Sequence, residues 1–157
     1  MLLQVFKRLD EWVQQENRRR NQAGTLPLDR ATFRVLGQTA LIEAQVDLDI
    51  PATLDVDAYT QASQVITNVL DQLLQLSGRS WDKHSGEIWM PEETEYIPFY
   101  NGGYVEASLA KLEYVLLSKA IKAPKKNHDL ITEYLVKGAS DLFLTLAAKY
   151  ELDLEDF

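Results

Sequence analysis

The spacing of apolar residues changes along the chain, and this change limits the possible folds more than any other feature of the sequence. Between Leu2 and Val13 they lie three and four positions apart, which is typical of an amphipathic helix, predicted here to run to about Arg20. The segment Leu54–Tyr59 (LDVDAY) instead alternates apolar and acidic residues, as a strand with one buried face does. Helical spacing returns after Ala62 and ends near Gly78. This mixture of periods predicts an α+β protein.

Shorter elements complete the expected order. A strand at Thr32–Leu36 stops at Gly37, and a helix follows at Gln38–Gln45. Further strands are expected near Glu87–Met90, Tyr96–Tyr100 and Tyr104–Ala107, and further helices at Leu109–Ile121, Asn127–Val136 and Ala139 to about Tyr150. No internal repeat or long linker divides the chain, so one domain over residues 1–157 is predicted. It comprises an N-terminal helix (1–20), an α/β core with a small mixed sheet (30–108) and a helical tail (109–157).

Charge and composition exclude several classes of protein. The 157 residues include 24 acidic and 16 basic side chains, a net charge of −8, which argues against nonspecific binding to duplex DNA. The absence of cysteine excludes disulfides, thiolate zinc sites and cysteine nucleophiles. Charged residues interrupt the apolar N-terminal stretch, so neither a signal peptide nor a membrane span is expected there. A soluble, cytoplasmic protein is the resulting expectation.

Asp55 and Asp57 are the most informative pair of polar residues. Residues two apart on a strand project from one face, and their Cα atoms lie roughly 7 Å apart, so both carboxylates could approach one cation. Leu54, Val56 and Ala58 would then face the core. Hard oxygen ligands of this kind suit Mg²⁺, which also binds substrate phosphates. The alternative is that the acidic residues form only a solvated strand face.

Gly37 adds a second element to this pattern. A glycine between a strand and a helix allows the backbone to approach a phosphate, and amides at a helix start attract anionic oxygen. Together with the acidic strand, the turn at Gly37–Gln38 could hold the phosphates of a nucleoside triphosphate beside a carboxylate-bound magnesium ion.

The segment RVLGQTALIEAQVDLDIPATLDVDAY, from Arg34 to Tyr59, resembles the core motif of the DNA polymerase β-like nucleotidyltransferase superfamily. In that motif a Gly-Gly or Gly-Ser pair opens a helix and an Asp-x-Asp strand follows; Gly37, Asp55 and Asp57 match it. The likeness is greatest to a small bacterial branch of minimal domains related to toxin–antitoxin and abortive-infection proteins. The later segment Leu109–Ile131 resembles the family's lysine-bearing helix and basic stretch. The resemblance implies Mg²⁺, a nucleoside triphosphate such as ATP, and an acceptor hydroxyl on RNA or on protein.

Two positions depart from the family pattern. Gln38 replaces the second small residue of the glycine pair. The family's third carboxylate, which would act as a base or a metal ligand, has three candidates, Glu87, Glu95 and Glu106. Glu87 is preferred because it follows Gly86 and begins an alternating run. Asp55, Asp57 and Glu87 are thus the expected catalytic residues, with Asp55 and Asp57 also as metal ligands.

Two lysines complete the expected site. Lys119 and Lys122 lie three apart on one predicted helix face, where they could neutralise triphosphate charge if that face borders the acidic strand. The alternative is a solvated helix end. Three hypotheses follow from the sequence: a Mg²⁺-dependent nucleotidyltransferase, a catalytically inactive descendant that serves as a binding module or as one half of a toxin–antitoxin or defence pair, and a helical interaction protein without a site near Asp55.

Overall fold

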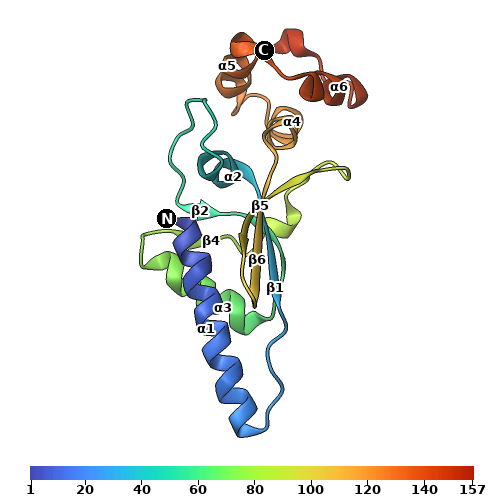
Figure 1. Ribbon diagram of the computed structural model, residues 1–157. Coiled ribbons are helices and arrows are strands. Elements are labelled where there is room, and N and C mark those ends of the chain that lie inside the picture. Colours follow the sequence, from blue (N-terminus) through green and yellow to red (C-terminus); the bar gives the residue numbers. More distant parts are fainter.

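The computed structural model describes all residues from Met1 to Phe157. Its helices are α1 (Leu2–Ala23), α2 (Gly37–Glu43), α3 (Gln64–Gln75), α4 (Leu112–Lys122), α5 (His128–Gly138) and α6 (Asp141–Lys149), with 3-10 turns η1 (Ser85–Glu87) and η2 (Leu154–Asp156). Its strands are β1 (Ala31–Val35), β2 (Asp55–Val56), β3 (Ala58–Gln61), β4 (Ser80–Trp81), β5 (Tyr96–Asn101) and β6 (Val105–Ala110). The predicted α+β class is confirmed (Figure 1).

The main sheet has four strands in the order β3-β1-β6-β5. Its two central strands, β1 and β6, are parallel, whereas β3 and β5 pair antiparallel to them at the edges. Alternate residues of β1 are buried, among them Phe33. The sheet is therefore mixed, as the sequence predicts. The strands β2 and β4 form a separate, parallel two-stranded sheet.

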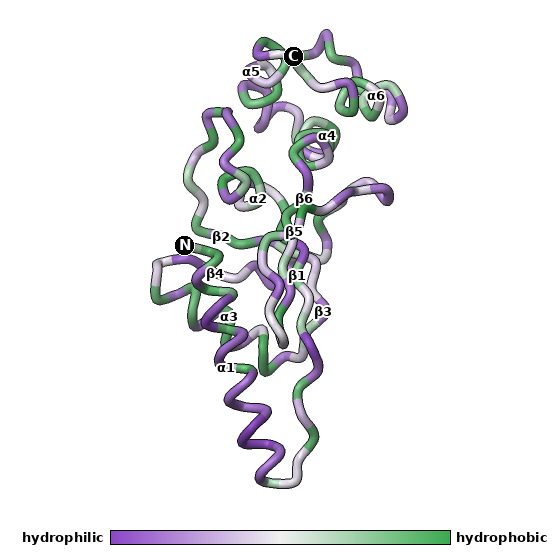
Figure 2. Tube along the Cα trace, in the orientation of Figure 1, coloured by the Kyte–Doolittle hydropathy of each residue, from purple (hydrophilic) through white to green (hydrophobic).

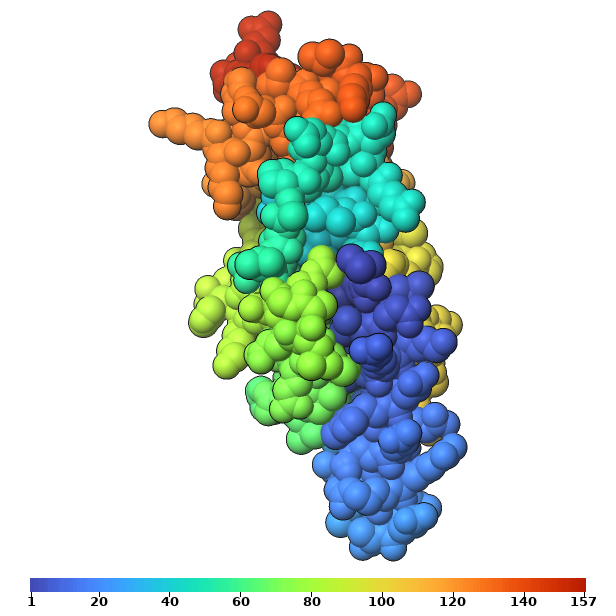
Figure 3. Space-filling model, turned by 90° about the vertical axis from the view of Figure 1, so that its left-hand side faces the viewer, coloured from blue at the N-terminus to red at the C-terminus, as the bar shows by residue number.

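Helix α1 covers one face of the main sheet and lies beside α3 (Figure 3). Its apolar stripe, from Leu2 to Val13, is buried, and the Phe6 ring packs 5.4 Å from that of Phe33 on β1. No residue of α1 beyond Val13 is fully buried. That hydrophilic end projects away from the sheet, on the opposite side of the molecule from α4–α6 (Figures 1 and 2). Burial of the apolar stripe therefore holds the first half of α1 against the rest of the protein, whereas its second half is not buried.

Helices α2 and α4 start where the parallel central strands end. Strand β1 leads into α2 and β6 leads into α4, and the two helices pack against each other. Helix α4 is buried along most of its length because α5 and α6 cover its other sides. No helix combines the length and the apolar composition needed to cross a membrane.

Most predicted elements are confirmed, but two strand predictions are wrong. The expected strand Leu54–Tyr59 is divided at Asp57, so its first part joins β4 and its second part joins β1. Val56 and Ala58 are buried as expected, whereas Leu54 is 68% exposed. The expected strand at Glu87–Met90 is absent, and Glu87 ends the 3-10 turn η1 instead.

Candidate functional site

The parallel strands β2 and β4 bring two aspartates together. Asp55 pairs with Ser80 and Val56 with Trp81, so Asp57 and Asp82 each follow directly after the last pair. The Asp82 amide also donates to the Val56 carbonyl over 3.1 Å. Because the carboxyl ends of parallel strands meet at one edge, the side chains of Asp57 and Asp82 emerge next to each other.

The turn at Gly37 is fastened to the same edge. The amide of Leu36 donates to the carbonyl of Asp57 over 2.8 Å, and the Thr39 hydroxyl donates to the carbonyl of Asp55 over 3.1 Å. Gly37 has a φ of +61°, a left-handed conformation that favours glycine. The start of α2 is thereby held against the aspartates.

These residues line one small cavity of about 220 Å³. One part of its lining is the turn together with Asp55 of β2 and the two aspartates that directly follow β2 and β4. Another part is α4 with the loop that follows it. The polar lining residues are Gly37, Gln38, Thr53, Asp55, Asp57, Asp82, Ser118, Lys119 and Lys126. The structure thus brings together five residues that the sequence proposes for the site, namely Gly37, Gln38, Asp55, Asp57 and Lys119.

Asp57 occupies an unfavourable position for a carboxylate. Its burial, followed by the proximity and negative charge of Asp82 and the charge of Asp55, raises its pKa to about 6, although Lys119 opposes this rise. Carboxylates held close together disfavour one another's charged form. The Oδ1 atom of Asp57 is buried without a hydrogen-bond partner. The cavity therefore concentrates negative charge that the protein itself does not fully compensate.

Lys119 supplies the main opposing charge. It is partly buried on α4, and its ammonium belongs to none of the salt bridges of the chain. Burial and the neighbouring charge of Lys126 lower its pKa, whereas Asp57 raises it. An uncommitted lysine opposite a group of aspartates is suited to bind an anionic ligand that also carries a cation.

The donor set fits a magnesium ion in part. No group of three or more histidine, cysteine, aspartate or glutamate side chains is arranged to hold a metal ion. Mg²⁺, however, commonly uses one or two carboxylates and takes its other ligands from water and substrate phosphate. The unpartnered Oδ1 of Asp57 and the raised pKa of that carboxyl are what a cation would relieve. Asp57, together with Asp55, would hold such an ion.

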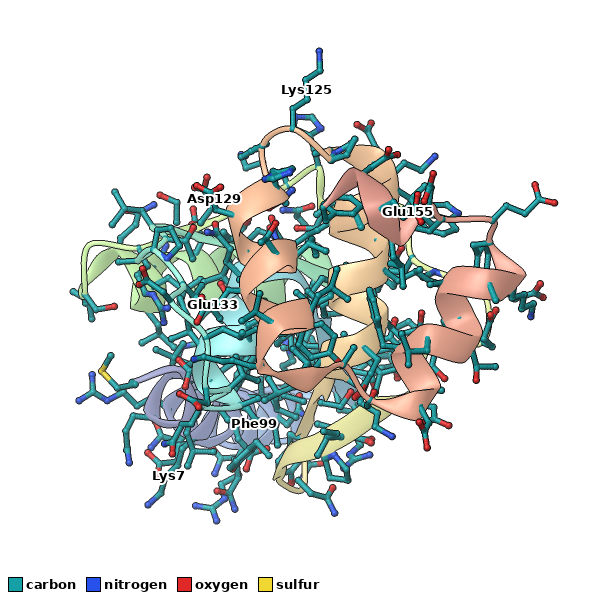
Figure 4. The ribbon with its side chains drawn as sticks, turned by 90° about the horizontal axis from the view of Figure 1, so that it is seen from above. Lys7, Phe99, Lys125, Asp129, Glu133 and Glu155 are labelled. Carbon is teal, nitrogen blue, oxygen red and sulfur yellow. The ribbon has the colours of Figure 1, made fainter.

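Two residues proposed from the sequence lie outside the cavity. Glu87 is exposed on η1 and does not line it. Lys122 is exposed at the end of α4, where its ammonium lies 5.2 Å from the centre of the Trp89 ring. Lys126, from the loop after α4, lines the cavity instead, whereas the neighbouring Lys125 projects away from the molecule (Figure 4).

The site expected from the sequence lacks two charged residues that line the cavity, Lys126 and, more importantly, Asp82. The polar stretch WDKHS suggests a surface loop, and a two-residue strand such as β4 is too short to show a period. One feature of the sequence could have indicated Asp82. It directly follows Ser80–Trp81, the first segment after the amphipathic helix that comes behind the Asp55–Asp57 strand. A parallel return strand is expected after such a crossover helix.

Comparison of the chain with family models, with curated proteins and with solved structures yields no match, so the assignment of function depends on the site itself.

Proposed function

We propose that the protein binds a nucleoside triphosphate with Mg²⁺ at this cavity and transfers a nucleotide from it to a hydroxyl group. One observation carries the proposal: the Gly37–Gln38 turn, three aspartates and two lysines from four separate parts of the chain converge on a single cavity. The resemblance to nucleotidyltransferases, found in the sequence around Gly37, Asp55 and Asp57, supports the same chemistry. A triphosphate substrate such as ATP also agrees with the cytoplasmic location expected from the sequence.

Each group has a role in this reaction. Asp55 and Asp57 would hold Mg²⁺, which would supply charge neutralisation at the phosphates. Lys119 and Lys126 would bind phosphate oxygens directly. The acceptor oxygen would attack the α-phosphorus, and the bond to the bridging oxygen would break as pyrophosphate leaves with the bonding electrons. Asp82 would accept the hydroxyl proton, since it is the remaining carboxylate that lines the cavity.

A second candidate function is nucleotide binding without catalysis, for example in a protein pair of the toxin–antitoxin or defence type. Gln38 favours it, because this larger residue lines the cavity at the position where the family motif has a small one. The lack of a three-ligand metal cluster also favours it. Both candidates require binding at the same cavity, and they differ only in turnover.

The melting temperature with ATP and Mg²⁺ tests the proposal. A ligand that binds only the folded state stabilises it by about 2.7 kcal/mol at a hundredfold excess over Kd, so wild-type protein should melt several degrees higher. The double variant Asp55→Asn/Asp57→Asn should show little shift. An equal shift in both proteins would contradict the proposal. Release of pyrophosphate in the presence of an acceptor would then separate catalysis from binding alone.

A further inference from the structure

A second, larger groove adjoins the candidate site. It has a volume of about 700 Å³ and runs between α3 and the segment from Trp81 to Gly86. Its floor is the edge strand β3, where Ala58 and Thr60 share a sheet face with Phe33 and Val35 of β1. Asp82 lines both the groove and the smaller cavity, so the two open onto the same carboxylate.

The α3 wall of this groove carries an unusual row of side chains. Gln64, Asn68, Gln72 and Gln75 follow one another at intervals of four, four and three residues, which places them on one stripe of the helix. Asp71 is the only charged residue of α3. The stripe is partly pre-oriented, because Gln64 donates to Asn68 over 2.8 Å and Gln75 to Asp71 over 3.0 Å.

The charge of the groove disfavours nucleic acid. Its ionisable lining groups are Asp71, Asp82 and Lys83, with a formal charge of −1. A phosphodiester backbone would be repelled by this surface, since binding of nucleic acid depends on a surplus of lysine and arginine.

The amide row matches the chemistry and the repeat of an extended polypeptide. Each asparagine or glutamine side chain offers one carbonyl acceptor and an NH₂ donor, the same pair as a peptide group. Residues four apart on a helix are separated by about 6 Å along its axis. Equivalent peptide groups of an extended chain recur every second residue, at roughly 6.6 Å. The row could therefore bind alternate peptide groups of an extended segment of about five residues.

We propose that this groove binds the acceptor, an extended polypeptide segment whose serine, threonine or tyrosine hydroxyl reaches Asp82. The inference rests on the proposed function, because it names the substrate class for the same site. The hydroxyl oxygen would enter the smaller cavity past Asp82, form the new bond to the α-phosphorus and leave its proton on that carboxylate. Trp81, which packs edge-on at 6.0 Å from Phe33, forms a fixed apolar contact for the segment.

Labelled transfer and direct binding test this proposal together. The probes are a degenerate mixture of uncharged pentapeptides centred on serine, threonine or tyrosine, and an oligouridylate of similar length. ATP radiolabelled at its α-phosphate, with Mg²⁺, reports transfer, because this phosphate stays on the acceptor when pyrophosphate leaves. The side-chain amide signals in a ¹⁵N NMR spectrum report binding without nucleotide. Gln72→Trp blocks the groove at an exposed position, and Val65→Trp, on α3 outside the groove, is the matched control.

We expect the peptides to be labelled by wild type and by Val65→Trp, and labelling to fall at least tenfold in Gln72→Trp. The shift in melting temperature with ATP and Mg²⁺ should be unchanged in Gln72→Trp. Equal labelling in both variants, labelling of the RNA alone, or no change of the α3 amide signals with peptide would overturn the inference. If the peptides bound but ATP neither raised the melting temperature nor labelled them, the proposed function would be contradicted, and the groove would be a peptide-binding site without that activity.

Discussion

Gly37 and Asp57 are so close that a side-chain carbon on the glycine would lie 3.3 Å from Oδ2 of the aspartate. Such a contact is tighter than an ordinary van der Waals contact, and the φ of +61° at Gly37 is unfavourable for any residue with a Cβ. Two independent constraints therefore require glycine at this position. The first involves the residue that follows β2, and the second belongs to the turn between β1 and α2.

The substitution Gly37→Ala should destabilise the protein through both constraints. The left-handed backbone alone costs roughly 1–2 kcal/mol with alanine, and displacement of Asp57 adds to it. Gly78→Ala is the matched control, since Gly78 has a φ of +75° with no atom near its missing Cβ. Urea denaturation should show a larger loss for Gly37→Ala. Equal losses would mean that the contact with Asp57 contributes nothing.

The raised pKa of Asp57 predicts a pH dependence of stability. Its pKa rises from 3.8 in the unfolded chain to about 6 in the folded protein. Between these values the folded state binds more protons, so the free energy of unfolding falls as the pH rises and is lowest above about 6. Asp57→Asn removes this loss, so in metal-free buffer the variant should melt higher than wild type at pH 7.5 and similarly at pH 4.

The exposed residue Asp55 provides the control for this measurement. Asp55 is exposed, and its charge contributes less to the pKa shift of Asp57 than burial does. Asp55→Asn should therefore retain most of the wild-type pH dependence of stability. If Asp57→Asn retained the wild-type pH profile between pH 4 and 7, the crowding of Asp57 by its neighbours would be refuted.

The sequence predicts this fold better than its site because the two depend on different information. Helices α1 and α3 have long apolar stripes, so their existence follows from local spacing, as burial of Phe6 and Leu70 confirms. The strands β2 and β4 have two residues each, and their pairing depends on where α3 returns the chain. Asp82 is placed by that pairing, which no local pattern reports. Glu87, chosen for its alternating surroundings, lies instead on an exposed turn.

Asp10 should contribute strongly to stability although it is distant from the site. Its Oδ1 accepts from the amides of Tyr104 and Val105, each over 2.8 Å, and its Oδ2 accepts from the Tyr100 hydroxyl over 3.0 Å. These bonds fasten α1 to the turn between β5 and β6. Hydrogen bonds to a charged group contribute about 1.5–3 kcal/mol each, and the amides would lose their partner.

We therefore expect Asp10→Ala to lower the free energy of unfolding by about 2–4 kcal/mol in urea denaturation. Asp29→Ala is a suitable control because Asp29 is exposed and its side chain belongs to no salt bridge of the chain. A loss below that of the control would show that water replaces these contacts.

The lysines of α4 offer a test of the proposed phosphate contacts. Lys119 lines the cavity, whereas Lys122, one turn later, contacts Trp89 outside it. Lys119→Met should weaken binding of ATP with Mg²⁺ about 10–100-fold, the loss expected for one hydrogen bond to a charged group. Lys122→Met removes one positive charge as well, but it should alter the Kd for ATP with Mg²⁺ less than about twofold. Titration calorimetry measures both, and similar losses would indicate only a long-range effect of charge.

Asp82 and Glu87 distinguish the site found in the structure from the one expected from the sequence. Asp82 lines both the cavity and the groove, and it helps to raise the pKa of Asp57, whereas Glu87 is exposed on η1. Loss of a catalytic base commonly lowers the rate by about 10²–10⁴-fold. Asp82→Asn should therefore reduce nucleotide transfer by at least about 100-fold while ATP still raises the melting temperature. Glu87→Gln should transfer nucleotide at the wild-type rate. If Glu87→Gln lost activity and Asp82→Asn kept it, Glu87 and not Asp82 would be the third carboxylate of the site.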